Sequence, residues 1–136
     1  MTESEVLGQL SWLVNELAQR ASVKLGLDQR SVLVRSTVVP SDRLATLIPI
    51  VTELMGPPVK PAGETARWKN WFDPFFKSVG GCEKQQSLWA RPIEDRVTLY
   101  LAFWPWASEP TRTSVRAGIA CWDEARRFKL EDFLKR

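Results

Sequence analysis

The chain has 136 residues, of which 44% are hydrophobic and 26% are charged, proportions typical of one soluble globular domain. Its 19 basic and 16 acidic side chains leave a formal net charge of +3, a mild excess spread along the chain. No apolar run is long enough to span a bilayer, and no histidine is present, which excludes self-contained Ser-His-Asp and Cys-His catalysis. We therefore expect one domain over residues 1–136.

The first element is a predicted helix over residues 2–21. Thr2 and Glu5 have the spacing of a capping box, in which each side chain accepts a backbone N–H near the helix start. Trp12 falls outside the apolar face, so it is either an exposed anchor for a partner or is covered by a loop or the C-terminal helix. We expect the helix to end at Gly26. The apolar residues at helical spacing are Val6, Leu7, Leu10, Leu13, Val14, Leu17, Ala18 and Ala21.

A short strand, a helix and a loop follow. Residues 31–39 are rich in β-branched side chains, which predicts a strand. Residues 41–56 have helical character, and Pro49 in their middle predicts either a kink or two short helices. Residues 56–63 contain three prolines and two glycines, a composition that indicates a loop.

Residues 68–76, with the sequence WKNWFDPFF, place five aromatic rings in nine positions. Together with Val79 these rings recur at helical spacing, which predicts a helix whose single apolar stripe is buried in the core. Pro74 bends this helix, or Asp73 caps a second short helix that Pro74 opens. The side chains of the stripe are Trp68, Trp71, Phe72, Phe75, Phe76 and Val79.

Three strands and a helix complete the chain. Residues 87–93, 96–104 and 114–122 have the alternation of strands, with a turn at 94–95, and residues 123–136 read as a helix. The order α-β-α-α-β-β-β-α predicts an α+β fold with an antiparallel sheet of three to four strands and helices packed on at least one face. The place of the early strand in this sheet is left open.

The alternation also assigns side chains to the two faces of the sheet. On the face directed toward the helices we expect Val97, Leu99, Leu101 and Phe103. On the opposite face we expect Tyr100, Trp104, Arg116 and Trp122. Trp106 and Arg112 lie on the loop between the last two strands. If no helix covers the opposite face, its aromatic and arginine side chains are exposed; if helices cover both faces, the rings are buried.

Missing motifs argue against an enzyme. The chain has neither a glycine-rich phosphate loop nor a dinucleotide-binding glycine pattern, and Cys82 and Cys121 lack the spacing of a metal site. The acidic pairs at 94–95 and 131–132 are explained by a turn and a helix, because catalytic carboxylates are usually brought together by folding. We expect no catalytic residue, no cofactor and no metal.

The leading hypothesis is a small cytoplasmic module that binds another protein and does not associate with a membrane. An inhibitor, an immunity-type protein or an adaptor subunit would each fit. Tryptophan and arginine are favoured at protein interfaces because they provide a large contact area and planar hydrogen bonding. The residues expected to bind the partner are Trp12, Tyr100, Trp104, Trp106, Arg112 and Arg116.

The alternative hypothesis is a nucleic-acid-binding protein or a subunit of a ribonucleoprotein. In that case Tyr100 or Trp104 stacks on unpaired bases. The basic residues expected to contact phosphates are Arg112, Arg116, Arg126, Arg127 and Lys129. An enzyme of unrecognised type is the third hypothesis, and it requires a concave pocket that contains at least two carboxylates, or a carboxylate with Lys or Arg.

Overall fold

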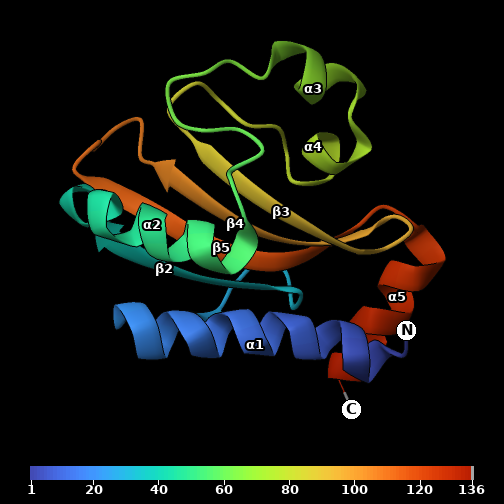
Figure 1. The fold of residues 1–136 in the computed structure, drawn as a ribbon. Helices are drawn as coiled ribbons and strands as arrows, with labels where there is room; N and C mark the ends of the chain where they lie inside the picture. The colour runs from blue at the N-terminus through green and yellow to red at the C-terminus, as the bar shows by residue number, and fades with distance from the viewer. Residues whose placement is uncertain (136) are drawn as a thin grey trace.

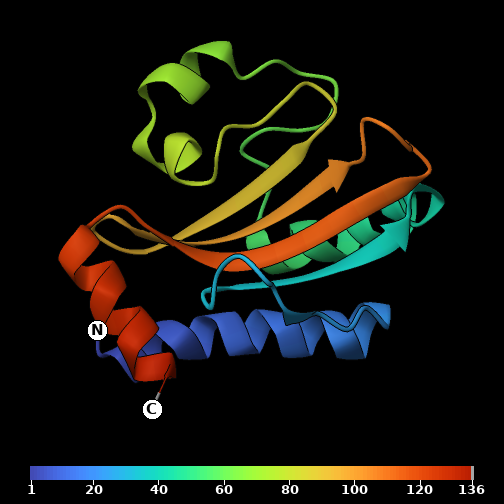
Figure 2. The same cartoon turned by 180° about the vertical axis from the view of Figure 1, so that it is seen from behind.

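A computed structural model describes residues 1–135 and contains a five-stranded antiparallel sheet with helices on both faces (Figures 1 and 2). The strands are β1 (Gly26–Leu27), β2 (Val34–Pro40), β3 (Ser87–Glu94), β4 (Val97–Pro105) and β5 (Arg112–Cys121). The helices are α1 (Glu3–Ala21), α2 (Leu44–Met55), α3 (Arg67–Phe72), α4 (Pro74–Ser78) and α5 (Glu124–Leu134), with a 3-10 turn, η1 (Ser41–Arg43), before α2. The strands lie in the order β1-β2-β5-β4-β3.

The α+β class is confirmed, whereas the sheet has five strands instead of the expected three to four. β1 is the additional strand, and its two residues pair with Arg35 and Ser36, a segment too short to leave a pattern in the sequence. β2 lies between β1 and β5, which places the early strand in the sheet. α1 ends at Ala21 and not at the predicted Gly26, because Ser22 adopts a left-handed conformation with φ of 54°.

Two further boundaries differ from the predictions. Pro49 lies inside an uninterrupted α2, so the alternative of two short helices is wrong. Glu94 still belongs to β3, and the first hairpin turns at Asp95 and Arg96. Arg96 has a left-handed φ of 60°, and its carbonyl accepts the backbone N–H of Trp122 (3.1 Å), which connects the turn to the end of β5.

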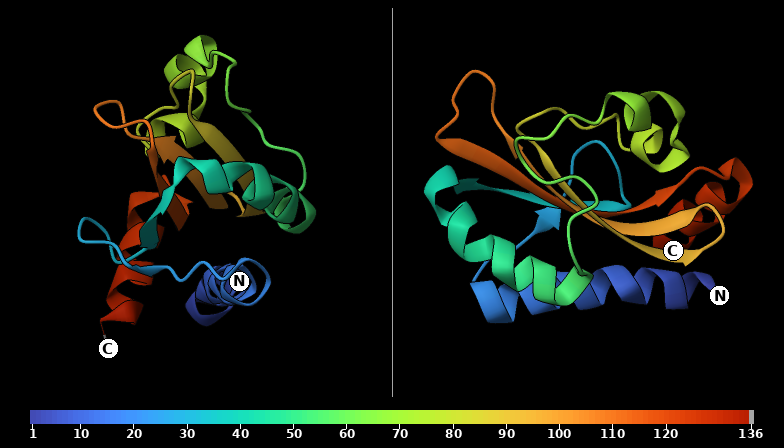
Figure 3. Two further views of the ribbon diagram at one scale, coloured as in Figure 1. Left: turned by 90° about the vertical axis from the view of Figure 1, so that its left-hand side faces the viewer. Right: turned by 45° about the horizontal axis from the view of Figure 1, so that its top comes forward.

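The main core lies between the sheet and α1, α2 and α5 (Figure 3, left). The side chains predicted to face the helices are all buried there: Val97, Leu99, Leu101 and Phe103. Trp89 of β3 is 1% exposed, and its ring lies 5.0 Å from that of Phe103 in an edge-on arrangement. From α1, the core receives Val6, Leu10, Leu13 and Leu17. Each of these side chains contributes about 1.5–3 kcal/mol of transfer free energy, so this face supplies most of the stability.

The opposite face of the sheet is covered in part by a lobe formed by residues 56–86, which carries α3 and α4 (Figure 1). Phe75 and Phe76 of α4 pack in a second cluster with Tyr100 and Ala120. Tyr100 is therefore only 5% exposed, and the expectation that an uncovered sheet face exposes it is wrong. Trp122 remains half-buried, so neither the fully open nor the fully covered alternative describes this face.

A buried lysine attaches the lobe to the sheet edge. Lys60 is 2% exposed, and its Nζ donates hydrogen bonds to the carbonyls of Lys84 (2.6 Å) and Gln86 (2.5 Å). Lys60 also forms a β-bridge with Leu88 of β3. Burial lowers the pKa of Lys60, because the charged form loses hydration.

We predict opposite effects for alanine at two glycines. A Cβ at position 118 would stand 2.9 Å from the Tyr100 ring and 3.0 Å from the Leu33 carbonyl oxygen, so Gly118→Ala must displace one of them. We expect it to lower the free energy of unfolding by about 1–3 kcal/mol. Gly8 in α1 has open space around it, so Gly8→Ala should raise the free energy of unfolding by up to about 1 kcal/mol. Urea unfolding measures both, and an unchanged Gly118→Ala protein would contradict this packing.

Candidate binding surfaces

Two polar side chains set the orientation of α3. Asn70 exchanges two hydrogen bonds with the backbone of Cys82: its Nδ2 donates to the carbonyl (3.0 Å), and its Oδ1 accepts the N–H (2.8 Å). Asp73 ends α3 and accepts two backbone N–H groups of α4 through Oδ1 (2.8 and 3.3 Å). α4 begins with Pro74, so the alternative of a second helix capped by Asp73 is confirmed.

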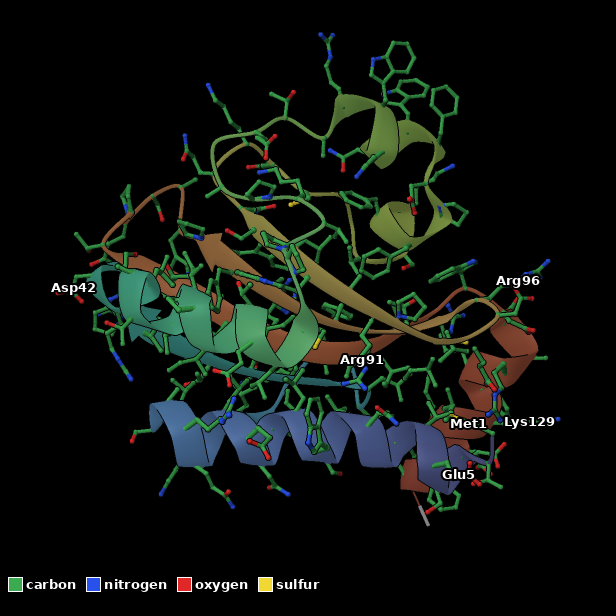
Figure 4. The ribbon with its side chains drawn as sticks, in the orientation of Figure 1. Met1, Glu5, Asp42, Arg91, Arg96 and Lys129 are labelled. Carbon is green, nitrogen blue, oxygen red and sulfur yellow. The ribbon has the colours of Figure 1, made fainter. Side chains whose placement is uncertain are left out.

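This orientation directs three aromatic side chains of α3 away from the sheet, and we call Trp68, Trp71 and Phe72 the aromatic patch. They are 78%, 74% and 68% exposed, respectively. The rings of Trp68 and Phe72 stack with their centroids 5.8 Å apart, and the Trp71 ring lies 6.5 Å from that of Phe72. Figure 4 shows aromatic side chains projecting from the outer side of α3. Together with Arg67 they line a hollow of about 490 Å³.

The prediction of one buried aromatic stripe is right for α4 and wrong for α3. Phe75 and Phe76 are 8% and 2% exposed, in contrast to the aromatic patch. Helical spacing relates two residues only while the helix continues, and Asp73 and Pro74 interrupt it. The rings of the two helices therefore no longer share a face. The adjacent Asp-Pro pair was the sequence signal that could have separated them.

The charged side chains around the aromatic patch are mainly cationic. Arg67 borders the hollow, and Lys69 and Lys77 are exposed on the same two helices. Lys69 is turned back toward the lobe, where its Nζ donates to the Val59 carbonyl (3.3 Å). Asp73 is the one carboxylate in α3, α4 and the junction between them, and its Oδ1 caps α4. The patch is thus an apolar surface with Arg67 at its edge, and Glu64 lines an adjoining hollow with Arg67 and Trp68.

A second candidate surface lies on the part of the sheet that the lobe leaves uncovered, and we call it the Arg116 groove. Arg116 of β5 lies over the indole ring of Trp104 of β4, with its Cζ 4.7 Å from the ring centroid. Its Nη2 is 3.5 Å from the carboxylate of Asp28. Two hollows of about 370 and 480 Å³ meet at this pair, since Trp104 and Arg116 line both. The larger hollow is also lined by Ser31, Ser78, Tyr100, Trp122, Glu124 and Arg127.

Two buried nitrogen atoms of the groove have no hydrogen-bond partner among residues 1–135: Nε of Arg116 and Nε1 of Trp104. Asp28 accepts the N–H of Arg30 (2.9 Å) and the hydroxyl of Ser36 (2.9 Å), and its contact with Arg116 is to Nη2, not to Nε. A buried donor without an acceptor costs about 1–3 kcal/mol. Such a group in a native fold calls for an explanation, and a bound ligand or water is the usual one.

The environment of the groove sets its charges near neutral pH. Burial by itself raises the pKa of Asp28, but the N–H of Arg30, the hydroxyl of Ser36 and the charge of Arg116 together hold that pKa below its usual value. Burial raises the pKa of Tyr100, and the nearby charge of Arg116 opposes this only in part. The groove therefore holds an ionised carboxylate and a neutral phenol beside a guanidinium.

Trp12 is not the exposed anchor that the sequence suggested. It is half-buried and packs against the main core. Arg91, labelled in Figure 4, lies on the side of β3 that faces α1, and its guanidinium carbon is 5.2 Å from the Trp12 ring centroid. Trp12 thus stabilises the contact between α1 and the sheet, and β3 provides the cover that was expected from a loop or the C-terminal helix.

Another aromatic–arginine pair lies at the connection between β4 and β5, where Trp106 is on the loop as predicted but Arg112 is the first residue of β5. Trp106 is half-buried, and its Nε1 donates to the hydroxyl of Ser114 (2.9 Å). Arg112 is exposed, lies 5.6 Å from the Trp106 ring centroid and pairs with Glu109 (3.5 Å). Among the six predicted partner-binding residues, the structure therefore pairs Trp104 with Arg116 and Trp106 with Arg112, and it leaves Trp12 and Tyr100 in packing roles.

The basic residues predicted to contact phosphates do not form one continuous surface. Arg126 is engaged inside the fold, since its guanidinium contacts the carboxylates of Glu3 (2.7 Å) and Glu94 (2.9 Å). Arg127 pairs with a carboxylate one turn further along α5 and also lines the larger hollow of the groove. Lys129 is exposed on α5 (Figure 4). Arg116 and Arg127 are the two that share a hollow.

Comparison of the chain with protein-family models, with curated proteins and with solved structures finds no match. In the described part of the chain, no helix is long and apolar enough to cross a membrane, and no group of three or more His, Cys, Asp or Glu is placed to hold a metal ion. Cys82 and Cys121 are buried free thiols, and burial raises the pKa of both. The two surfaces are therefore interpreted from their own chemistry.

We predict that Arg126 is a structural residue and that Arg127 is not. Arg126→Gln removes the guanidinium that contacts Glu3 and Glu94, although Glu94 keeps its ion pair with the N-terminal amine (3.2 Å). We expect it to lower the free energy of unfolding by about 1–3 kcal/mol. Arg127→Gln removes one exposed ion pair, and we expect a change within about 0.5 kcal/mol. Urea unfolding of the two variants side by side measures the difference. Equal stabilities would show that the Arg126 contacts do not form.

Proposed function

We propose that this protein is a small non-enzymatic binding module that docks onto another protein through the aromatic patch. The observation that carries this proposal is the exposure of Trp68, Trp71 and Phe72 side by side. Single exposed apolar residues are ordinary on protein surfaces, but a contiguous aromatic cluster is typical of an interaction site. Tryptophan is also among the residues most enriched at the centres of protein interfaces.

The way the lobe holds α3 supports this proposal. Asn70 is bonded to the backbone of Cys82, and Lys60 joins the lobe to the segment before β3. The rings therefore stand on a scaffold with defined contacts, and ordering them on binding costs less conformational entropy than ordering a flexible tail. Exposure that is maintained by specific polar contacts indicates a surface prepared for a partner.

The chemistry of the patch specifies the kind of partner. The hollow of about 490 Å³ between the rings accepts apolar side chains of a partner segment. Arg67 at its edge favours a carboxylate beside those apolar side chains. We therefore expect an acidic amphipathic segment, whose apolar residues at helical spacing enter the hollow.

The test is selection from a library of displayed peptides about four helical turns long. We expect the selected peptides to combine apolar residues at helical spacing with Asp or Glu. A selected peptide should then lose affinity for the Trp71→Ser protein by about tenfold or more, because buried tryptophans dominate such contacts. Fluorescence anisotropy of the labelled peptide measures this loss.

Phe128→Ser is the matched control. Phe128 is 71% exposed on α5 and lies outside the patch, so its replacement should leave peptide affinity unchanged. Both variants should unfold within about 0.5 kcal/mol of the parent, since both side chains are exposed. Peptides that bind equally to the Trp71→Ser protein would overturn the proposal. Patch-dependent binding to vesicles of anionic phospholipid, with no peptide selected, would assign the surface to a lipid membrane instead.

Retention on heparin separates this proposal from the nucleic-acid hypothesis. Arg126 contacts Glu3 and Glu94, and Arg112 pairs with Glu109, so two of the five basic residues predicted to contact phosphates are already paired with carboxylates. We expect any retention at low ionic strength to be lost by about 0.15 M salt. Retention that persists above this concentration and falls steeply with further salt would favour nucleic acid.

A further inference from the structure

We propose that the Arg116 groove binds a ligand that carries a single carboxylate on a flat apolar group. This inference concerns a different surface from the aromatic patch and does not rest on the proposed function. The carboxylate belongs either to a free small molecule or to the C-terminus of a peptide, because both present the same chemistry to the groove. The two sources are separated by the test below.

The donors of the groove lack an acceptor. The Arg116 side chain is 15% exposed, its Nε has no partner, and its contact with Asp28 at 3.5 Å is longer than an ordinary N–H···O hydrogen bond. The edge of a guanidinium formed by Nε and one Nη is the edge that receives a carboxylate with two parallel hydrogen bonds. A small rotation of Arg116 toward the larger hollow presents this edge to a ligand.

Trp104 provides a second unsatisfied donor at the same place. Its indole Nε1 is buried without an acceptor, and its ring lies beneath the Arg116 guanidinium at 4.7 Å. Because the ring supports the guanidinium from one side, Arg116 keeps its plane when it turns toward the hollow. Both nitrogen atoms are sealed from solvent in the observed arrangement, so a ligand oxygen reaches them only after Arg116 turns, and it then provides an acceptor for donors that are otherwise buried and unpaired.

The walls of the larger hollow specify the body of the ligand. Tyr100, Trp104 and Trp122 present aromatic surface, and the hollow of about 480 Å³ has room for one ring-sized group. The hydroxyl groups of Ser31 and Ser78 supply further hydrogen-bonding atoms. A flat apolar group between these walls buries its apolar surface, and an inorganic anion has no such surface to bury.

The charges of the groove favour one negative charge on the ligand. Arg116 and Arg127 line the larger hollow together with Glu124, and Asp28 stands beside Arg116. Arg127 also pairs with Glu131 (3.5 Å), so the charges of the two arginines are offset by nearby carboxylates. A dianion such as phosphate meets repulsion that a singly charged carboxylate largely avoids.

The experiment follows the indole N–H resonance of Trp104 in two-dimensional ¹H–¹⁵N spectra, identified by its absence from the Trp104→Phe protein. Phenylacetate is the probe, and neutral phenylacetamide is its isosteric control. We expect phenylacetate to shift this resonance in a saturable manner and to bind about tenfold or more tightly than phenylacetamide, because only the carboxylate makes charge-assisted hydrogen bonds. Inorganic phosphate should bind more weakly than phenylacetate.

Two arginine variants locate the binding group. Arg116→Gln should weaken phenylacetate binding by about tenfold or more. Arg112→Gln is the matched control. Arg112 is on the same strand and also lies over an indole ring, but it is outside both hollows. Its replacement should change the affinity by less than about twofold.

Acetyl-glycyl-phenylalanine with a free or an amidated C-terminus is the probe for a peptide source. Binding of the free-acid peptide identifies a chain terminus as a fitting source, and binding of phenylacetate alone identifies a small molecule.

Several results would overturn the inference. These are the absence of a saturable Trp104 shift, equal binding of phenylacetate and phenylacetamide, and tighter binding of phosphate than of phenylacetate. Undiminished binding by the Arg116→Gln protein would do the same. If the Arg116→Gln protein does not fold, the comparison of acid and amide on the unaltered protein decides the question by itself.

Discussion

The break between α3 and α4 is the constraint on which both candidate surfaces depend. The Asp73 carboxylate ends one helix and caps the next, and Pro74 has no N–H with which to continue the first. Phe75 and Phe76 then turn onto the sheet, while the aromatic patch turns outward. An unbroken helix would have placed all of these rings on one face and would have buried them together or exposed them together.

The packing of α4 also determines how much of the sheet stays open. Phe75 lies 6.2 Å from the rings of both Tyr100 and Trp122, so the lobe covers β4 and reaches the end of β5. Further along β5, Arg116 is covered by no helix and lies over Trp104 instead. The lobe closes this face only in part, whereas α1, α2 and α5 bury most of the apolar side chains on the other.

Polar contacts within the lobe fix its internal arrangement, while Phe75 and Phe76 pack it against the sheet. Lys60 and Asn70 act through backbone carbonyls and N–H groups, and these bonds have a specific geometry that hydrophobic contacts lack. Desolvation of Lys60 opposes its burial, so its net contribution to stability is smaller than its short bonds suggest. Its bonds hold residue 60 against the segment 84–86, and the pair of bonds between Asn70 and Cys82 then sets the direction of α3. The presentation of the aromatic patch therefore follows from these contacts.

The local sequence by itself determined the elements that repeat a simple pattern. The helical spacing of α1 and the alternation of β4 and β5 identified which side chains enter the main core, because these periods follow directly from backbone geometry. The α+β class followed from the order of the elements. β1 was not predicted, because two residues are too few to show the alternation of a strand.

Tertiary structure alone decided whether a residue that was predicted to be exposed is buried, paired or free. Tyr100 is buried because residues more than twenty positions earlier fold over it, and Arg126 is engaged because Glu3 and Glu94 reach it from distant parts of the chain. The direction of Trp68 and Trp71 depended on the helix break and on the bond from Asn70 to Cys82. Periodicity describes one element at a time, whereas burial is a property of how elements meet, and so the core was predictable from the sequence and the binding surfaces were not.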